Sequence, residues 1–325
     1  AFVADDDNGP ALFYWSNGLT TRLVKRGDAI PGTATNRFTT FGQPAFDHGA
    51  LYFIGADSTN YRGVHRFDGT LSPGLFSSME TYPATSLPHA FSSQLSVEGA
   101  RFAVWSFASN NQPNALFTWS NGVRSFLVSS NDAIPGAGVN FYTFQSPPDL
   151  QGGMVAFKGG SLANFQEGIF LRPFSGGNIV PVVRRGDPHL GLSGTLTSFN
   201  EMAIEDGQVW FHAGGTGGES LFLWRSNQYS RVLSSGMKLG TRTISSAGGF
   251  TFNQNCYHQD QAAFVVRFTD TTKALCLTTN QPSAEASFTF ARIAGTNTPI
   301  PGGTGSFASL SSALLWQGGA VFTGN

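Results

Sequence analysis

Two pairs of basic residues are the first candidates for a binding site in this sequence of 325 residues. Lys25-Arg26 and Arg184-Arg185 occupy the same place in two similar phrases, and His189 follows the second pair. Guanidinium groups bind carboxylates and sulfates through paired hydrogen bonds. If the strand that ends in each pair is the innermost strand of its sheet, one residue of each pair faces a central channel. The pattern predicts an anion site suited to an anionic sugar. The alternative is that the basic side chains form ion pairs with neighbouring Asp residues and bind no ligand.

Aspartates in tight turns are the second candidates. Three copies of the phrase carry one: Asp28, Asp132 and Asp187. Calcium loops supply several oxygen ligands, whereas each of these turns supplies one. We therefore expect each carboxylate to accept hydrogen bonds from backbone N–H groups of its own turn, with Asn297 at the matching place in a later copy. The Arg26-Gly27-Asp28 tripeptide, which matches an integrin-binding motif, is then a by-product of the repeat, and no metal ligand is assigned.

Catalysis by acid and base would need a converging set of titratable side chains. Candidate members of such a set are His89, His189, Glu201, Tyr257 and His258. The histidines show no metal-ligand spacing, and the sequence has no nucleophile elbow, no P-loop and no dinucleotide-binding glycine motif before a helix. We assign no catalytic residue and no cofactor, and we expect a protein that is not an enzyme.

Tryptophans at the ends of predicted strands are candidates for stacking on sugar rings. They are Trp15, Trp119 and Trp224. The repeat positions of the other aromatic residues indicate packing inside the fold.

These residues belong to an internal repeat. The phrase Leu23–Gly32 returns as Leu127–Gly136 and again at 292–302, with shorter copies at 182–188 and 231–237. The period is 50 to 57 residues, so that six copies fit the chain.

Each repeat reads as four short strands. An apolar strand leads into the turn, a second strand runs to a Gly turn, a third is strongly apolar and a fourth is short and aromatic. This order is typical of one blade of a β-propeller. We expect the third strands in the middle of the blades, where they bury Phe53, Trp105, Phe157, Phe211, Phe264 and Phe322.

The sequence thus predicts one all-β domain, 1–325, folded as a six-bladed β-propeller. Its repeats start near residues 21, 72, 124, 181, 230 and 288, and residues 1–20 complete the last blade, so that N- and C-terminal strands close the ring. We expect Ala11–Trp15 in the same sheet as Ala320–Thr323, or beside a strand of that sheet. Ala1–Ala4 matches the same third-strand position as Ala320–Thr323, so one strand is in excess.

The repeats also resemble those of a known family. Gly27-Asp28, Gly186-Asp187 and the Ile-Pro-Gly phrases at 134–136 and 300–302 are similar to the tandem Gly-Asp-x-x-Pro-Gly repeats of bacterial, largely uncharacterised β-propeller proteins. The resemblance covers most of the chain and departs from the pattern in the second and fifth copies. It implies a propeller fold and a secreted or surface-anchored protein, and it brings no assigned catalytic residue.

Composition excludes several classes of function. Only 12% of the residues are charged and the net charge is −1, which gives no broad basic surface for nucleic acid. The apolar runs are too short for a membrane span. Cys256 and Cys276 lie in no metal-binding motif. The sequence is consistent with a disulfide between them and with two separate buried thiols. Both ends read as strands cut from a longer chain.

The sequence therefore predicts an extracellular or cell-surface module that binds a glycan or a protein partner. One alternative is a carbohydrate-active lyase or hydrolase that acts on an anionic polysaccharide. Another is a self-assembling surface or filament subunit, because open sheet edges at the terminal strands can pair between copies.

Overall fold

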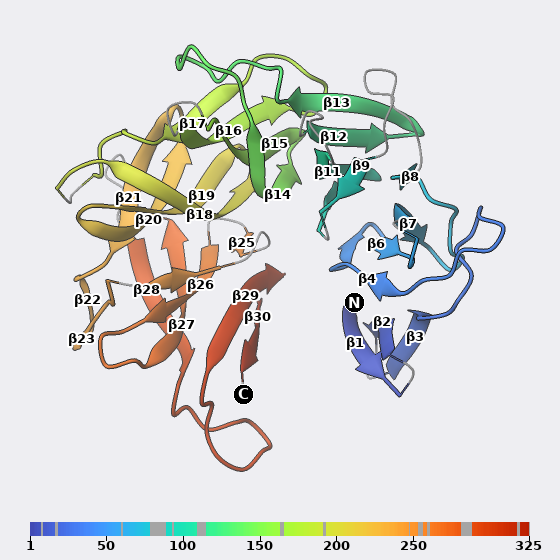
Figure 1. Ribbon diagram of the computed structural model, residues 1–325. Helices are drawn as coiled ribbons and strands as arrows, with labels where there is room; N and C mark the ends of the chain where they lie inside the picture. Colours follow the sequence, from blue (N-terminus) through green and yellow to red (C-terminus); the bar gives the residue numbers. More distant parts are fainter. Residues whose placement is uncertain are drawn as a thin grey trace. The chain divides into compact units, whose positions relative to one another are not determined.

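The computed structural model consists of β-strands (Figure 1). It describes residues 1–7, 9–16, 19–59, 61–78, 89–92, 94–108, 115–162, 166–190, 193–246, 248–252, 256–258, 261–280, 288–316 and 319–324. Within these ranges there is no helix, and hence none that could cross a membrane. A chain rich in Phe, Val, Thr and Gly favours short strands joined by tight turns.

The chain divides into two compact units. Unit 1 comprises Ala1–Val155, Gly159–Leu162 and Arg172–Asn178, and unit 2 comprises Ala156–Lys158, Ala163–Leu171 and Ile179–Asn325.

The sheets follow one another in chain order, and each is antiparallel. The first contains β1 (Phe2–Asp6), β2 (Gly9–Ser16) and β3 (Leu19–Lys25). The second begins with a strand in two pieces, β4 (Thr40–Phe41) and β5 (Ala45–Asp47), and continues through β6 (Ala50–Ala56), β7 (Arg62–Phe67) and β8 (Phe76–Ser77). The third begins with β9 (His89–Phe91) and β10 (Ser96–Glu98) and continues through β11 (Arg101–Ala108), β12 (Ala115–Ser120) and β13 (Val123–Ser129).

The later sheets repeat this order. The fourth contains β14 (Thr143–Gln151), β15 (Met154–Gly160), β16 (Glu167–Pro173) and β17 (Val180–Arg184). The fifth contains β18 (Leu196–Glu205), β19 (Gln208–Gly215), β20 (Gly218–Arg225) and β21 (Gln228–Ser234), and a short hairpin of β22 (Lys238–Leu239) and β23 (Arg242–Thr243) follows it. The sixth contains β24 (Phe250–Thr251), β25 (Tyr257–His258), β26 (Gln261–Arg267), β27 (Lys273–Asn280) and β28 (Phe288–Gly295), and the seventh contains β29 (Leu310–Trp316) and β30 (Gly319–Gly324).

The first strand of each sequence repeat closes the sheet of the repeat before it. β13 pairs with β12, β21 with β20 and β28 with β27. A sheet therefore holds the second, third and fourth strands of one repeat and the first strand of the next. The sequence shows the length of the repeat. Which four strands share a sheet depends on strand pairing, which only the structure shows.

The leading strands of successive sheets in unit 1 are joined by side chains. Gln94 Nε2 donates to Gln43 Oε1 at 2.7 Å, between the second and third sheets. Ser96 Oγ donates to Asp149 Oδ1 at 3.0 Å, between the third and fourth. The leading edges of these sheets thus lie next to one another.

The third strands form the middle of the second to sixth sheets, as the sequence predicts, whereas the last one, in β30, pairs only with β29 among the described residues. Four of their six predicted aromatic residues are at most 1% exposed: Phe53, Phe157, Phe211 and Phe264. Trp105 and Phe322 are half-buried. Cys256 and Cys276 are both buried and form no disulfide, so two buried thiols are the correct alternative.

The turn aspartates are structural, as predicted. The Oδ2 atoms of Asp28, Asp132 and Asp187 accept the backbone N–H three residues earlier at 2.9, 2.7 and 2.7 Å. In a later copy Thr298 Oγ1 accepts the N–H of Gly295 at 2.9 Å. Thr298, and not Asn297, therefore fills the Asp position, and the sequence alignment is wrong there by one residue.

The terminal strands lie in separate sheets of the two units. Ala11–Trp15 belongs to β2, which pairs with β1 and β3. Ala320–Thr323 belongs to β30, which pairs with β29. Closure of a ring through these segments stays a prediction.

Candidate functional site

The predicted basic pairs lie at the trailing edges of their sheets. Lys25 is the last residue of β3 and Arg184 the last of β17, and exposed Arg26 and Arg185 follow them. β17 comes after three other strands of its sheet. Both strands therefore end their sheets. The channel-facing role of the pairs, which requires these strands to be the innermost ones, stays a prediction.

His189 is buried rather than exposed at a binding surface. It occupies the turn position that Ile30 and Ile134 hold in other copies, and it is 2% exposed. Its Nε2 lies 2.9 Å from Ser220 Oγ. Burial lowers the pKa of His189, and the nearby charge of Arg231 lowers it further. The imidazole is therefore neutral near pH 7 and packs as part of the core.

The predicted stacking tryptophans are not exposed platforms where the structure describes them. Trp224 is buried, and Trp119 stacks on Phe102 with ring centroids 5.2 Å apart. Tyr257, a candidate acid or base, packs on Trp210 at 5.5 Å. The side chains of Trp15, His89 and His258 lie outside the described residues.

Glu201 is the one candidate acid that contacts another titratable group in the described part of the chain. Its Oε2 lies 3.0 Å from Nδ1 of His212, and Glu219 Oε2 lies 3.4 Å from Nε2 of the same ring. The two carboxylates come from β18 and β20, on either side of β19, which carries His212. Asn200 and Glu201 fall in a bulge of β18, between Phe199 and Met202.

Electrostatics favour the charged forms of His212 and Glu219. Burial alone lowers the pKa of His212, but hydrogen bonds with Glu201 and Glu219 outweigh burial and raise it. The hydrogen bond with His212 is the main cause that lowers the pKa of Glu219 to about 2. Glu219 also accepts the N–H of Gly249 at 3.0 Å, which ties the fifth sheet to the start of the sixth.

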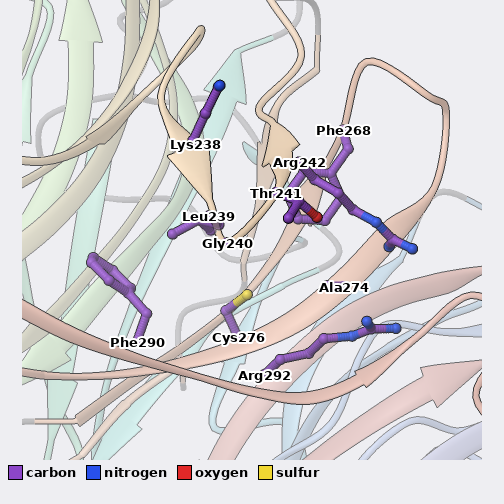
Figure 2. A pocket seen from close by; sticks show the side chains of 10 residues that line it. All are labelled: Lys238, Leu239, Gly240, Thr241, Arg242, Phe268, Ala274, Cys276, Phe290 and Arg292. Carbon is purple, nitrogen blue, oxygen red and sulfur yellow. The ribbon is translucent and has the colours of Figure 1, made fainter.

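A cavity of about 580 Å³ lies in unit 2 between the β22–β23 hairpin and strands β27 and β28 (Figure 2). Three cations line it: Lys238, Arg242 and Arg292. Figure 2 shows the guanidinium groups of Arg242 and Arg292 extending toward the same side of the pocket. The cavity therefore offers a concentration of positive charge in a chain with few charges.

The cations of the pocket are only partly neutralised. Arg242 Nε lies 3.7 Å from Asp270, which is half exposed, and its guanidinium lies over the ring of Phe268. Among the described residues, no carboxylate lies within ion-pair distance of Lys238 or Arg292. Two of the three charges are thus open to an anion from outside.

Apart from the hydroxyl of Thr241, the other side chains of the pocket wall are apolar. Leu239, Phe268, Ala274 and Phe290 line it, together with the thiol of Cys276. Burial raises the pKa of Cys276 to about 11, although Arg292 opposes this shift, so the thiol is uncharged near neutral pH. None of the side chains in this part of the wall carries a negative charge that would repel an anion.

A shortened turn opens the cavity. In the first copy of the turn, Phe38 follows Asp28 by ten positions and donates its N–H to the Asp28 carbonyl. In the fifth copy, Ile244 follows Met237 by seven positions and makes the same bond. The shorter segment forms the β22–β23 hairpin, which carries Lys238 and Arg242. The pocket therefore lies where the repeat departs from its own pattern.

Sequence reasoning missed this pocket because its cations come from three separate positions. Residues 238 and 242 lie in the hairpin, and residue 292 lies fifty positions further on, in β28. The signal that was present is the degraded fifth copy of the repeat. Departures from a regular pattern are the places where function is expected.

No protein-family model matches the chain, and neither does any curated protein. Among solved structures, the β-propeller domain of the Trilobed protease from Pyrococcus furiosus matches with a TM-score of 0.47 and 10% identity, over 80% of this chain and 67% of that one. The Trypanosoma rangeli sialidase matches with a TM-score of 0.45 and 11% identity, over 99% of this chain. The chain spans 56% of the sialidase's length.

Proposed function

We propose that this chain is a binding module, secreted or displayed at the cell surface, whose ligand carries an anionic group. The observation that carries the proposal is the pocket of Lys238, Arg242 and Arg292, in which two cations have no carboxylate partner among the described residues. Two guanidinium groups on one side of a partly enclosed space bind a carboxylate, sulfate or phosphate through directed hydrogen bonds. The ligand belongs to a glycan or to a protein partner.

The architecture proposed for the module is a six-bladed β-propeller of the Gly-Asp-x-x-Pro-Gly repeat type, closed by its terminal strands. Support comes from consecutive antiparallel sheets of one repeat length each. The side-chain bonds that join successive leading strands in unit 1 also support it, because the innermost strands of neighbouring blades lie closest together.

Titration calorimetry with sulfate, phosphate and glucuronate tests the proposed function. We expect saturable binding that weakens as sodium chloride is added, since salt screens the charges. Arg292→Ala should weaken binding about tenfold, or about 1.4 kcal/mol. Arg267→Ala, which removes an exposed arginine of the same sheet outside the pocket, is the matched control and should leave binding unchanged. The proposal is contradicted if no anion binds, or if both variants lose binding equally.

A second candidate function is a carbohydrate-active enzyme for an anionic polysaccharide. The observation that favours it is Glu201, a partly exposed carboxylate held by buried His212. Such an enzyme would generate unsaturated ends that absorb ultraviolet light, or new reducing ends. Glu201→Gln should then abolish product formation and leave anion binding at Arg292 intact. A polymer that keeps its length in the presence of the protein rules this candidate out.

A further inference from the structure

The pocket lies where the repeat lacks an aromatic ring. On the fourth strand of the sheets, the residue that faces the third strand at one register position carries a ring: His65 opposite Phe53, and Phe222 opposite Phe211. At the same register position Cys276 faces Phe264. The sixth sheet therefore has a thiol side chain of two heavy atoms where the second and fifth sheets have a ring.

In the second, fourth and fifth sheets this ring stacks on an aromatic ring of the third strand. The centroids are 5.5 Å apart for Phe53 and His65, and 5.0 Å apart for Phe211 and Phe222. Phe157 and Phe170 form the same kind of pair at 5.7 Å. Since Cys276 cannot fill that volume, space remains above β27, and the cavity is lined by Cys276. Figure 2 shows its sulfur between Phe290 and the two arginines.

The lining of this space favours a ring without hydroxyl groups. Ala274, Cys276 and Phe290 present carbon and sulfur atoms, and Thr241 is the one neutral hydroxyl side chain among the lining residues. A sugar ring placed beside Ala274, Cys276 and Phe290 would lose hydrogen bonds from its hydroxyl groups to water, and these three side chains offer no strong hydrogen bonds in return, which costs free energy. A flat aromatic ring has no such cost, and it contacts Phe290 in an offset or edge-on arrangement.

We propose that the ligand's anchoring group is an aromatic ring with an anionic substituent, the ring above Cys276 and the anion between Arg242 and Arg292. This inference rests on the proposed function, because it assigns the ligand of the same pocket. The shared chemistry is that of an aryl phosphate, sulfate or carboxylate. It occurs on a modified tyrosine of a partner polypeptide and in free aromatic acids.

Calorimetry with the full chain compares phenyl phosphate, inorganic phosphate and glucose 6-phosphate. All three carry a phosphate group, and only the first adds an aromatic ring. We expect phenyl phosphate to bind at least tenfold more tightly than the other two. A phosphotyrosine peptide identifies the source of the ligand. If the peptide binds more tightly than phenyl phosphate, the partner is a polypeptide, and if the two bind equally, the ligand is a free aromatic acid. Both outcomes support the shared chemistry.

Two substitutions of Cys276 test where the aromatic ring of the ligand binds. Cys276→Phe restores the ring that the other sheets have, and it should remove the preference for phenyl phosphate. Cys276→Leu fills part of the same space and serves if the larger side chain prevents folding; it should reduce the preference. Cys256→Ser changes the other buried cysteine, which does not line the pocket, and is the control that should retain the preference. Circular dichroism spectra verify that each variant has the fold of the parent chain.

The outcomes separate this inference from the proposed function. Equal affinity for phenyl phosphate and inorganic phosphate overturns the ring assignment and leaves anion binding in place. A preference that persists in both Cys276→Phe and Cys276→Leu also overturns it. Absence of binding by all three phosphates contradicts the proposed function itself.

Discussion

His212 is a buried imidazole between two carboxylates, and its environment couples its protonation to folding. The contacts at 3.0 Å with Glu201 and 3.4 Å with Glu219 stabilise the imidazolium. Removing the ring leaves the two carboxylates facing each other without a cation. Loss of one member of a buried ion pair costs about 3–5 kcal/mol, and about 2–3 kcal/mol is expected here because both carboxylates keep some contact with water.

The pH dependence follows from the direction of the pKa shift of His212. Its pKa is raised in the folded chain above the ordinary value of 6.5. The stabilising contribution is therefore complete below pH 6.5 and is lost as the pH rises through the raised pKa. We predict that His212→Gln lowers the free energy of unfolding at pH 6 by more than at pH 9. Urea unfolding at the two values measures this, and an equal loss at both would show that His212 is not held as an imidazolium.

At the scale of elements, the turns between sheets were the most predictable part of the fold. A carboxylate three residues after a strand residue can accept that residue's N–H, and this local bond needs no tertiary information. The same reasoning misplaced the sixth copy, because Asn297 and Thr298 both carry a side-chain oxygen. His189 was misjudged because its turn position is apolar in other copies, a fact that appears only when the turns are aligned through their hydrogen bonds.

The Asp bond can be measured in one turn. We predict that Asp132→Ala lowers the free energy of unfolding by about 1 kcal/mol, because the N–H of Ser129 loses its acceptor. Asp132→Asn keeps an oxygen at the same place and should lose less. Chemical unfolding of the two variants compares them, and identical losses would mean that the carboxylate oxygen is not the stabilising group.

At the scale of the whole chain, the repeat gives the number and order of strands, but it does not give the strand pairing. Pairing showed that the strand before each Asp turn ends a sheet, which moved Lys25 and Arg184 to trailing edges. The pocket was beyond prediction because it depends on the volume left by a shortened turn and by Cys276. An unfilled volume in the core results from how side chains pack. A sequence motif reports only which residues are present, so it cannot predict such a volume.

The proposed closure predicts the distance between two exposed positions. Leu19 at the start of β3 and Ala308 just before β29 are both exposed and accept spin labels. If β29–β30 and β2–β3 complete one blade, the labels lie within a few strand spacings of about 4.8 Å each. Pulsed electron resonance should then give one short, narrow distance distribution. A broad distribution at long distances would contradict closure by the terminal strands.

A crystal structure of the chain with phenyl phosphate tests whether the cavity beneath the β22–β23 hairpin is the ligand site. We expect electron density for the phosphate within hydrogen-bonding distance of Arg242 and Arg292, with the ring above Cys276. Density beside the basic pairs at 25–26 or 184–185, with an empty cavity, would contradict it.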